Sequence, residues 1–182
     1  DSSLVTPPSP EPTGTDLPSE TPFPTRVVEL GGQNVTLPDG SLVISVPEGW
    51  FAYSLPHEMD IQNYPDEDAG GEFMAGDSRV RIVLNVSPGE QGQNTRPLID
   101  AVVKSERDYY AANGLDASGL LDPEAVTLGE LAGYQFHITD APGYLVVYLA
   151  DGMGHVVRIA VLPTSSPTFD EALRIVESIR FN

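Results

Sequence analysis

Chemistry-bearing side chains are concentrated between positions 56 and 79, in a segment rich in acids, glycines and prolines. Carboxylates suit calcium or magnesium, and a histidine among them suits zinc or manganese. The spacing matches neither an EF-hand loop nor a glycine-rich calcium repeat, so a solvated acidic loop is the alternative to a metal site. The candidate partner-binding residues are Asp66, Glu67, Asp68 and Glu72, and the candidate metal ligands of the alternative interpretation are His57, Glu58 and Asp60.

The three histidines do not fall in a catalytic motif. His57, His137 and His155 are accompanied by many serines and acids, but the nucleophile sequence G-x-S-x-G is absent. His137 lies on one face of an alternating segment and His155 begins another, which favours structural roles. The chain has no lysine-containing phosphate-binding loop and no cysteine. We therefore expect a protein that is not an enzyme and holds no cofactor.

The charge balance restricts the partners. The chain has 27 acidic and 9 basic residues, a formal net charge of -18, and Lys104 is its only lysine. Nucleic-acid binding needs Lys and Arg to neutralise phosphates, and anionic membranes need the same, so both are disfavoured. Such a field attracts cations or the basic surface of another protein, although an acidic surface also serves solubility alone.

Composition divides the chain into two parts. Residues 1–25 contain seven of the seventeen prolines and no base, which predicts a disordered stalk, and residues 26–182 have the length of one domain. The stalk resembles the region that follows the lipidated cysteine of bacterial lipoproteins. This likeness predicts a secreted or cell-envelope protein on the extracytoplasmic face, with a membrane tether through a lipid. An interdomain linker is the alternative.

Alternating apolar residues predict strands over much of the domain, near 27–30, 35–37, 42–46, 51–53, 80–86, 134–138, 144–149 and 155–162. The last three follow one another with short turns, which predicts an antiparallel meander. Trp50, after the turn at Pro47, is expected to be a buried anchor beneath the terminal helix. Residues 56–79 are expected to be an irregular excursion from the sheet.

Two helices are expected. Asn94 or Thr95 precedes a segment with apolar residues at three- and four-residue spacing that stops at Asn113-Gly114. Near the C-terminus, Thr168 and Glu171 have the spacing of a capping box ahead of an amphipathic stripe. The order of strands, helix, strands and helix predicts an α+β fold.

The sequences VPEGW, GYQFHITDAPGYLVVYLADGMGHVVRIAVLP and SPTFDEALRIVESIRF together resemble the PsbP-like fold group over about residues 26–182. That group includes the extrinsic PsbP subunit of photosystem II, Mog-type Ran-binding proteins and many bacterial lipoproteins. The resemblance implies an antiparallel β-sheet flanked by α-helices on both faces, an αβα sandwich, and docking to other proteins. This chain departs from PsbP itself in its acidic balance and scarcity of lysine, so no binding residue is carried over.

Overall fold

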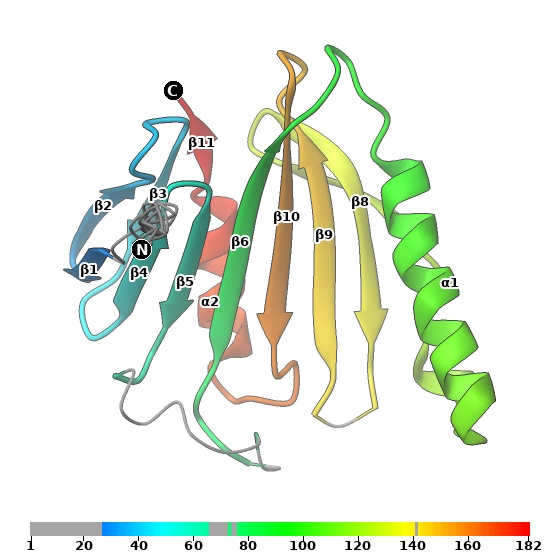
Figure 1. Cartoon of the computed structure of the whole chain (residues 1–182). Coiled ribbons are helices and arrows are strands. Elements are labelled where there is room, and N and C mark those ends of the chain that lie inside the picture. Colours follow the sequence, from blue (N-terminus) through cyan, green and yellow to red (C-terminus); the bar gives the residue numbers. More distant parts are fainter. Residues whose placement is uncertain (1–26, 66–72, 74–75, 141) are drawn as a thin grey trace, which may run out of the picture.

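The computed structural model describes residues 27–65, 73, 76–140 and 142–182 (Figure 1). The stalk predicted for residues 1–25 lies outside the described residues and stays a prediction. The strands are Val27–Leu30 (β1), Gln33–Thr36 (β2), Leu42–Val46 (β3), Phe51–Leu55 (β4), Glu58–Gln62 (β5), Arg81–Pro88 (β6), Glu124–Leu128 (β7), Leu131–Ile138 (β8), Tyr144–Ala150 (β9), His155–Leu162 (β10) and Arg180–Phe181 (β11). The helices are Arg96–Asn113 (α1), the short 3-10 helix Ala117–Gly119 (η2) and Phe169–Glu177 (α2).

In the described part of the chain the strands form two sheets, and neighbouring strands in each are antiparallel. The larger sheet has eight strands in the order β1-β4-β5-β6-β10-β9-β8-β7, and the smaller has three in the order β11-β3-β2. The predicted meander is confirmed, because β8 pairs with β9 and β9 pairs with β10. Together with two helices, this arrangement places the protein in the α+β class.

Strand alternation divides the core into two clusters, because successive side chains point to opposite faces of a sheet. On β9, Val146 belongs to the cluster that includes Ile99 and Val103 of α1. Its neighbours on β9, Leu145 and Val147, belong to the larger cluster, which also contains α2 and the three-stranded sheet. The helix α1 therefore lies over β8 and β9 on one face, while α2 packs beside β10 and β3 (Figure 1).

Both helices are where the pattern predicts, although their caps differ in detail. Gly114 ends α1 with a φ of 65°, the left-handed conformation that glycine adopts without strain. At the start of α2, Thr168 makes no side-chain cap. Its hydroxyl donates instead to the Ser78 carbonyl at 2.7 Å, and Glu171 accepts from Trp50. The predicted capping box is thus wrong, because tertiary partners replace the local ones.

The segment 56–79 is not irregular throughout, and this corrects the prediction. Its residues 58–62 form β5, which pairs with β4 and β6 inside the large sheet. Met59 and Ile61 supply the buried face, while Asp60 on the other face pairs with Arg81 at 2.6 Å. The ion pair allows a carboxylate in the middle of a sheet, where an unpaired charge is costly.

Gly31 marks the point where the chain changes sheets. The strand before it, β1, pairs with β4, whereas the strand after it, β2, pairs with β3. A Cβ atom on Gly31 would lie 1.9 Å from the Pro47 carbonyl oxygen, so only glycine fits this close approach. Among the described residues, no helix has the length and apolar character that crossing a membrane requires.

Candidate functional site

The structure separates the three candidate metal ligands. On β5, alternation places Glu58 and Asp60 on the face opposite Met59 and Ile61, whereas His57 lies exposed in the turn before β5. The His57 ring nitrogen Nδ1 lies 2.8 Å from Asp39 Oδ2. Within the described ranges, no three histidine, aspartate or glutamate side chains gather in a way that would hold a metal ion.

The candidate partner-binding acids Asp66, Glu67, Asp68 and Glu72 lie outside the described residues, so their role stays a prediction. The described residues at the two ends of that segment are close together. The Arg79 guanidinium lies 5.6 Å from the Tyr64 ring centroid and 5.5 Å from that of Phe73. Arg79 also pairs with Asp77 at 2.7 Å. Arg79 therefore links Tyr64 to Phe73 and Asp77.

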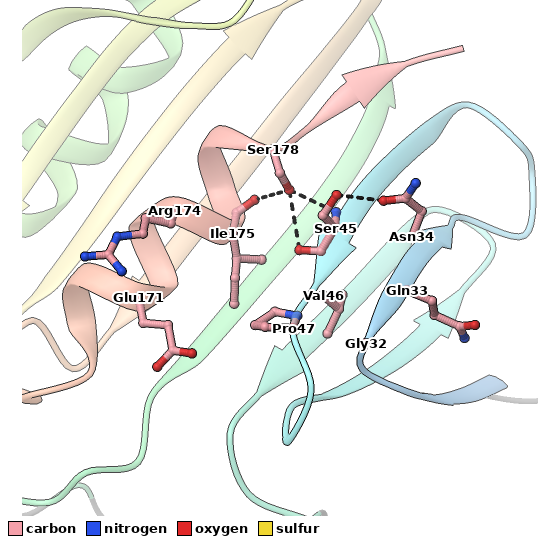
Figure 2. A pocket seen from close by; sticks show the side chains of 10 residues that line it. All are labelled: Gly32, Gln33, Asn34, Ser45, Val46, Pro47, Glu171, Arg174, Ile175 and Ser178. Atoms are coloured by element: carbon pink, nitrogen blue, oxygen red, sulfur yellow. Dashed lines mark hydrogen bonds between the residues drawn. The ribbon is translucent and has the colours of Figure 1, made fainter.

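An open groove of about 670 Å³ runs between β2, β3 and α2 (Figure 2). A chain of hydrogen bonds crosses it: the Ser45 hydroxyl donates to Asn34 Oδ1 at 2.7 Å, and the Ser45 amide donates to Ser178 Oγ at 2.9 Å. The Ser178 hydroxyl in turn donates to the Ile175 carbonyl at 2.7 Å. These polar groups are satisfied by one another, so the groove is a joint between α2 and the small sheet.

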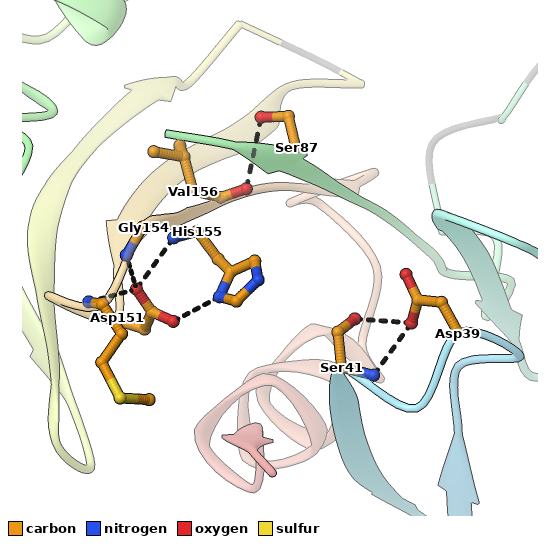
Figure 3. Close-up of polar contacts among 8 residues, drawn as sticks. Asp39, Ser41, Ser87, Asp151, Gly154, His155 and Val156 are labelled. Atoms are coloured by element: carbon orange, nitrogen blue, oxygen red, sulfur yellow. Dashed lines mark hydrogen bonds and ion pairs between the residues drawn. The ribbon is translucent and has the colours of Figure 1, made fainter. Parts of the chain in front are cut away.

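A second polar centre lies at the turn between β9 and β10 (Figure 3). Asp151 Oδ1 accepts backbone N–H groups from Met153, Gly154 and His155 at 2.8, 3.0 and 2.9 Å. Its Oδ2 lies 2.6 Å from His155 Nδ1, and the His155 ring stacks on Phe181 at 5.5 Å. Burial raises the pKa of the Asp151 carboxyl, but hydrogen bonds from His155 and the turn amides outweigh it and lower the pKa.

Asp39 is arranged in a similar way in the turn between β2 and β3. It accepts the Ser41 amide at 2.9 Å and the Ser41 hydroxyl at 2.6 Å, and it also faces His57. Burial raises the pKa of Asp39, but the Ser41 hydrogen bonds and His57 outweigh that effect and lower it. Each of these Asp–His pairs joins a histidine to an aspartate that also accepts hydrogen bonds within its turn.

A third feature, which the sequence analysis did not single out, surrounds the C-terminal end of α1. We call it the α1-end face and define it by Tyr109, Leu115 and Leu121, which are 58%, 49% and 42% exposed. They are three of the four large hydrophobic side chains that the described residues expose. Asp122 fixes the segment to the helix through its contact with Arg107 at 2.8 Å. Apolar side chains with this exposure are typical of contact surfaces when they cluster.

The α1-end face is surrounded by carboxylates. Its flanking acids Asp108, Asp116 and Asp122 are all exposed, and Asp108 and Asp122 pair with Lys104 and Arg107. Further acids lie behind it, where burial together with the Glu106 carboxylate raises the pKa of Tyr144. The sequence has seven acids and no Lys or Arg between Arg107 and Arg158. This run was visible in the sequence, but only the fold shows that part of it surrounds exposed apolar side chains.

Comparisons with known proteins do not assign the chain to a family. No protein-family model matches it, and no curated protein matches its sequence. A crystal structure from Bacteroides thetaiotaomicron is similar with a TM-score of 0.45 and 11% sequence identity, over 84% of this chain. The chain spans about half the length of that protein, 49%. So low a score identifies neither a fold family nor an activity.

Proposed function

We propose that this protein is a non-catalytic binding domain that docks to another protein through the α1-end face. The observation that carries the proposal is the exposure of Tyr109, Leu115 and Leu121 beside a helix end where the flanking acids outnumber the bases. Tyrosine is enriched among the residues that dominate binding energy in protein interfaces, because its ring is large, rigid and amphipathic.

The surrounding charge selects a basic partner. The acids that flank the face, Asp108, Asp116 and Asp122, outnumber the bases Lys104 and Arg107 that pair with two of them. They attract a positively charged surface and repel an acidic one. Attraction between opposite charges at the rim speeds association, and salt weakens this attraction. Salt does not weaken the burial of the apolar side chains in the same way. The two contributions together give a specific, salt-sensitive contact. The acids Asp66, Glu67, Asp68 and Glu72 would add to the same attraction wherever they meet the partner.

We propose further that the domain works outside the cell, at the cell envelope, as the lipoprotein-like stalk suggests. The PsbP-like αβα sandwich is part of this proposal, and the positions of α1 and α2 against different core clusters support it. Docking rather than chemistry is what that fold group would imply, and fold alone does not fix function.

The test is affinity capture with the full chain from cell-envelope extract, followed by chemical crosslinking and mass spectrometry. The double variant Tyr109→Ser, Leu121→Ser removes the apolar contacts, and Met153→Ser is the matched control because Met153 is 67% exposed elsewhere. We expect a basic protein that the wild type and the control capture and the double variant does not. Surface substitutions change stability by less than about 0.5 kcal/mol, so both variants should fold. Equal capture by all three chains would reject the α1-end face.

A further inference from the structure

The segment that carries Leu121 leads directly into β7, and among the described strands β7 is the last one of the large sheet. A strand at the edge of a sheet has one row of backbone N–H and C=O groups without strand partners. Natural edges are blocked by charged side chains, prolines, short strands or covering elements. In β7, EAVTL, the charged residue is Glu124, Pro123 precedes the strand, and the stretch 125–128 has neither a charge nor a proline. The helix α1 packs over β8 and β9.

The register of the hairpin tells which groups are free. Leu128 and Leu131 are partners across the two-residue turn that begins at Gly129, whose φ of 60° suits a type II′ turn. Such a turn closes on a hydrogen-bonded pair, and in an antiparallel ladder bonded and non-bonded pairs alternate. Val126 is therefore bonded to β8, whereas Ala125 and Thr127 direct their backbone groups outward.

Charge decides what kind of strand this edge accepts. The exposed acids Glu124 and Glu130 belong to or flank β7, and no basic residue lies between positions 115 and 130. Asp122, just before the strand, pairs with Arg107 of α1. A second copy of the chain would bring the same acids together at the edge, which is unfavourable, whereas lysines of a basic strand would face Glu124. The edge therefore favours a basic partner over self-association.

We propose that an extended, basic segment of the partner protein adds to β7 as a ninth strand, with its main chain bonded to Ala125 and Thr127. This inference rests on the proposed function, because it specifies how the partner of the adjoining α1-end face is held. Main-chain hydrogen bonds give such complexes affinity, and alternate side chains give them specificity. Apolar residues of the partner beyond the strand would contact Leu121.

The probe is a synthetic peptide that alternates Lys and Thr, with a peptide alternating Glu and Thr as the charge control. Amide hydrogen exchange of the full chain, followed residue by residue with NMR, reads the edge directly. In the free chain we expect Ala125 and Thr127 to exchange rapidly, and Val126 and Leu128 to be protected by β8. The Lys peptide should slow exchange at Ala125 and Thr127 about tenfold, and the Glu peptide should not.

Two substitutions separate backbone from side chain. Thr127→Pro removes the outward N–H without a bond to β8, and proline is tolerated at such edge positions. Thr127→Ala is the matched control, because it keeps the N–H and removes only the side chain. We expect the Lys peptide to bind Thr127→Pro about tenfold more weakly, and Thr127→Ala within about twofold of the wild type. If Thr127→Pro does not fold, Ala125→Pro and the exchange data on the wild type provide the same test.

Four results would overturn strand addition. The first is equal binding of the Lys peptide to both Thr127 variants, and the second is protection from exchange that does not include Ala125 and Thr127. The third is equal binding of the Lys and Glu peptides. The fourth is protection of the edge when the protein concentration alone is raised, which would show that a second copy binds there. The two proposals can also fail separately. If the Tyr109→Ser, Leu121→Ser chain loses capture from the envelope extract and Thr127→Pro keeps it, the docking function stands and only strand addition is rejected.

Discussion

Trp50 offers the sharpest test of how the domain is held together. The side chain is 3% exposed and belongs to the larger core cluster. Its indole N–H donates to Glu171 Oε1 of α2 at 3.1 Å, and its carbonyl accepts the Gly31 amide at 2.8 Å. Trp50 therefore lies where α2, the small sheet and the crossing at Gly31 meet. Trp50→Ala should destabilise all three together.

The magnitude follows from the area that the indole buries. A buried tryptophan removes roughly 150–250 Å² from water, worth about 4–6 kcal/mol at about 25 cal/mol per Å². Substitutions of this kind cost about 3–5 kcal/mol, because the surroundings relax only in part. Trp50→Phe keeps most of the ring and loses the N–H bond to Glu171. It should cost about 1–2 kcal/mol, since Glu171 is exposed and its carboxylate can turn to water.

Urea unfolding followed by far-UV circular dichroism measures both variants without tryptophan fluorescence. With a denaturant slope of about 2 kcal/mol per M, Trp50→Ala should lower the midpoint by about 2 M, and Trp50→Phe by less than half as much. A cost below about 1 kcal/mol for Trp50→Ala would refute the burial argument. So would red-shifted, readily quenched fluorescence of the native protein, because that signal places the indole in water.

Four further outcomes follow from the same structure. Burial lowers the pKa of His137, against a smaller opposing effect of Glu124. The stability that neutral His137 contributes is therefore complete above about pH 6.5 and is lost as the pH falls further. In the His137→Gln variant, the urea midpoint should depend less on pH between about pH 6.5 and 5 than in the wild type. Gly133→Ala should cost about 3 kcal/mol or more in the same assay, since its Cβ would lie 1.8 Å from the Tyr148 carbonyl oxygen, and unchanged stability would contradict the register of β8. Asp151→Ala should cost about 2 kcal/mol at neutral pH and less as acid protonates Asp151, measured by thermal melts across pH. Deleting residues 1–25 should leave the melting temperature nearly unchanged, and a loss above about 1 kcal/mol would show that the stalk docks on the domain.

Patterns that extend over one element allowed the sequence to predict that element. The spacing of apolar residues in α1, its end at Asn113-Gly114 and the three strands of the meander are all confirmed. Burial of Trp50 at α2 is confirmed as well. In each case the residues that decide the structure are close together in sequence, so hydrophobic period and turn chemistry are sufficient.

The tertiary structure decided what depends on distant partners. The sequence near position 60 is typical of a loop, but Asp60 lies in a strand because it pairs with Arg81. Glu171 has the spacing of a capping residue, but it accepts a hydrogen bond from the Trp50 N–H. The same holds for the candidate sites. His57 is adjacent to Glu58 in sequence, but it lies in the turn before β5 and contacts Asp39. The segment that carries Leu121 lies beside α1, where Asp122 contacts Arg107. Composition therefore determined that this protein is strongly acidic, and long-range strand pairing decided which of the described strands stands at the edge of the large sheet.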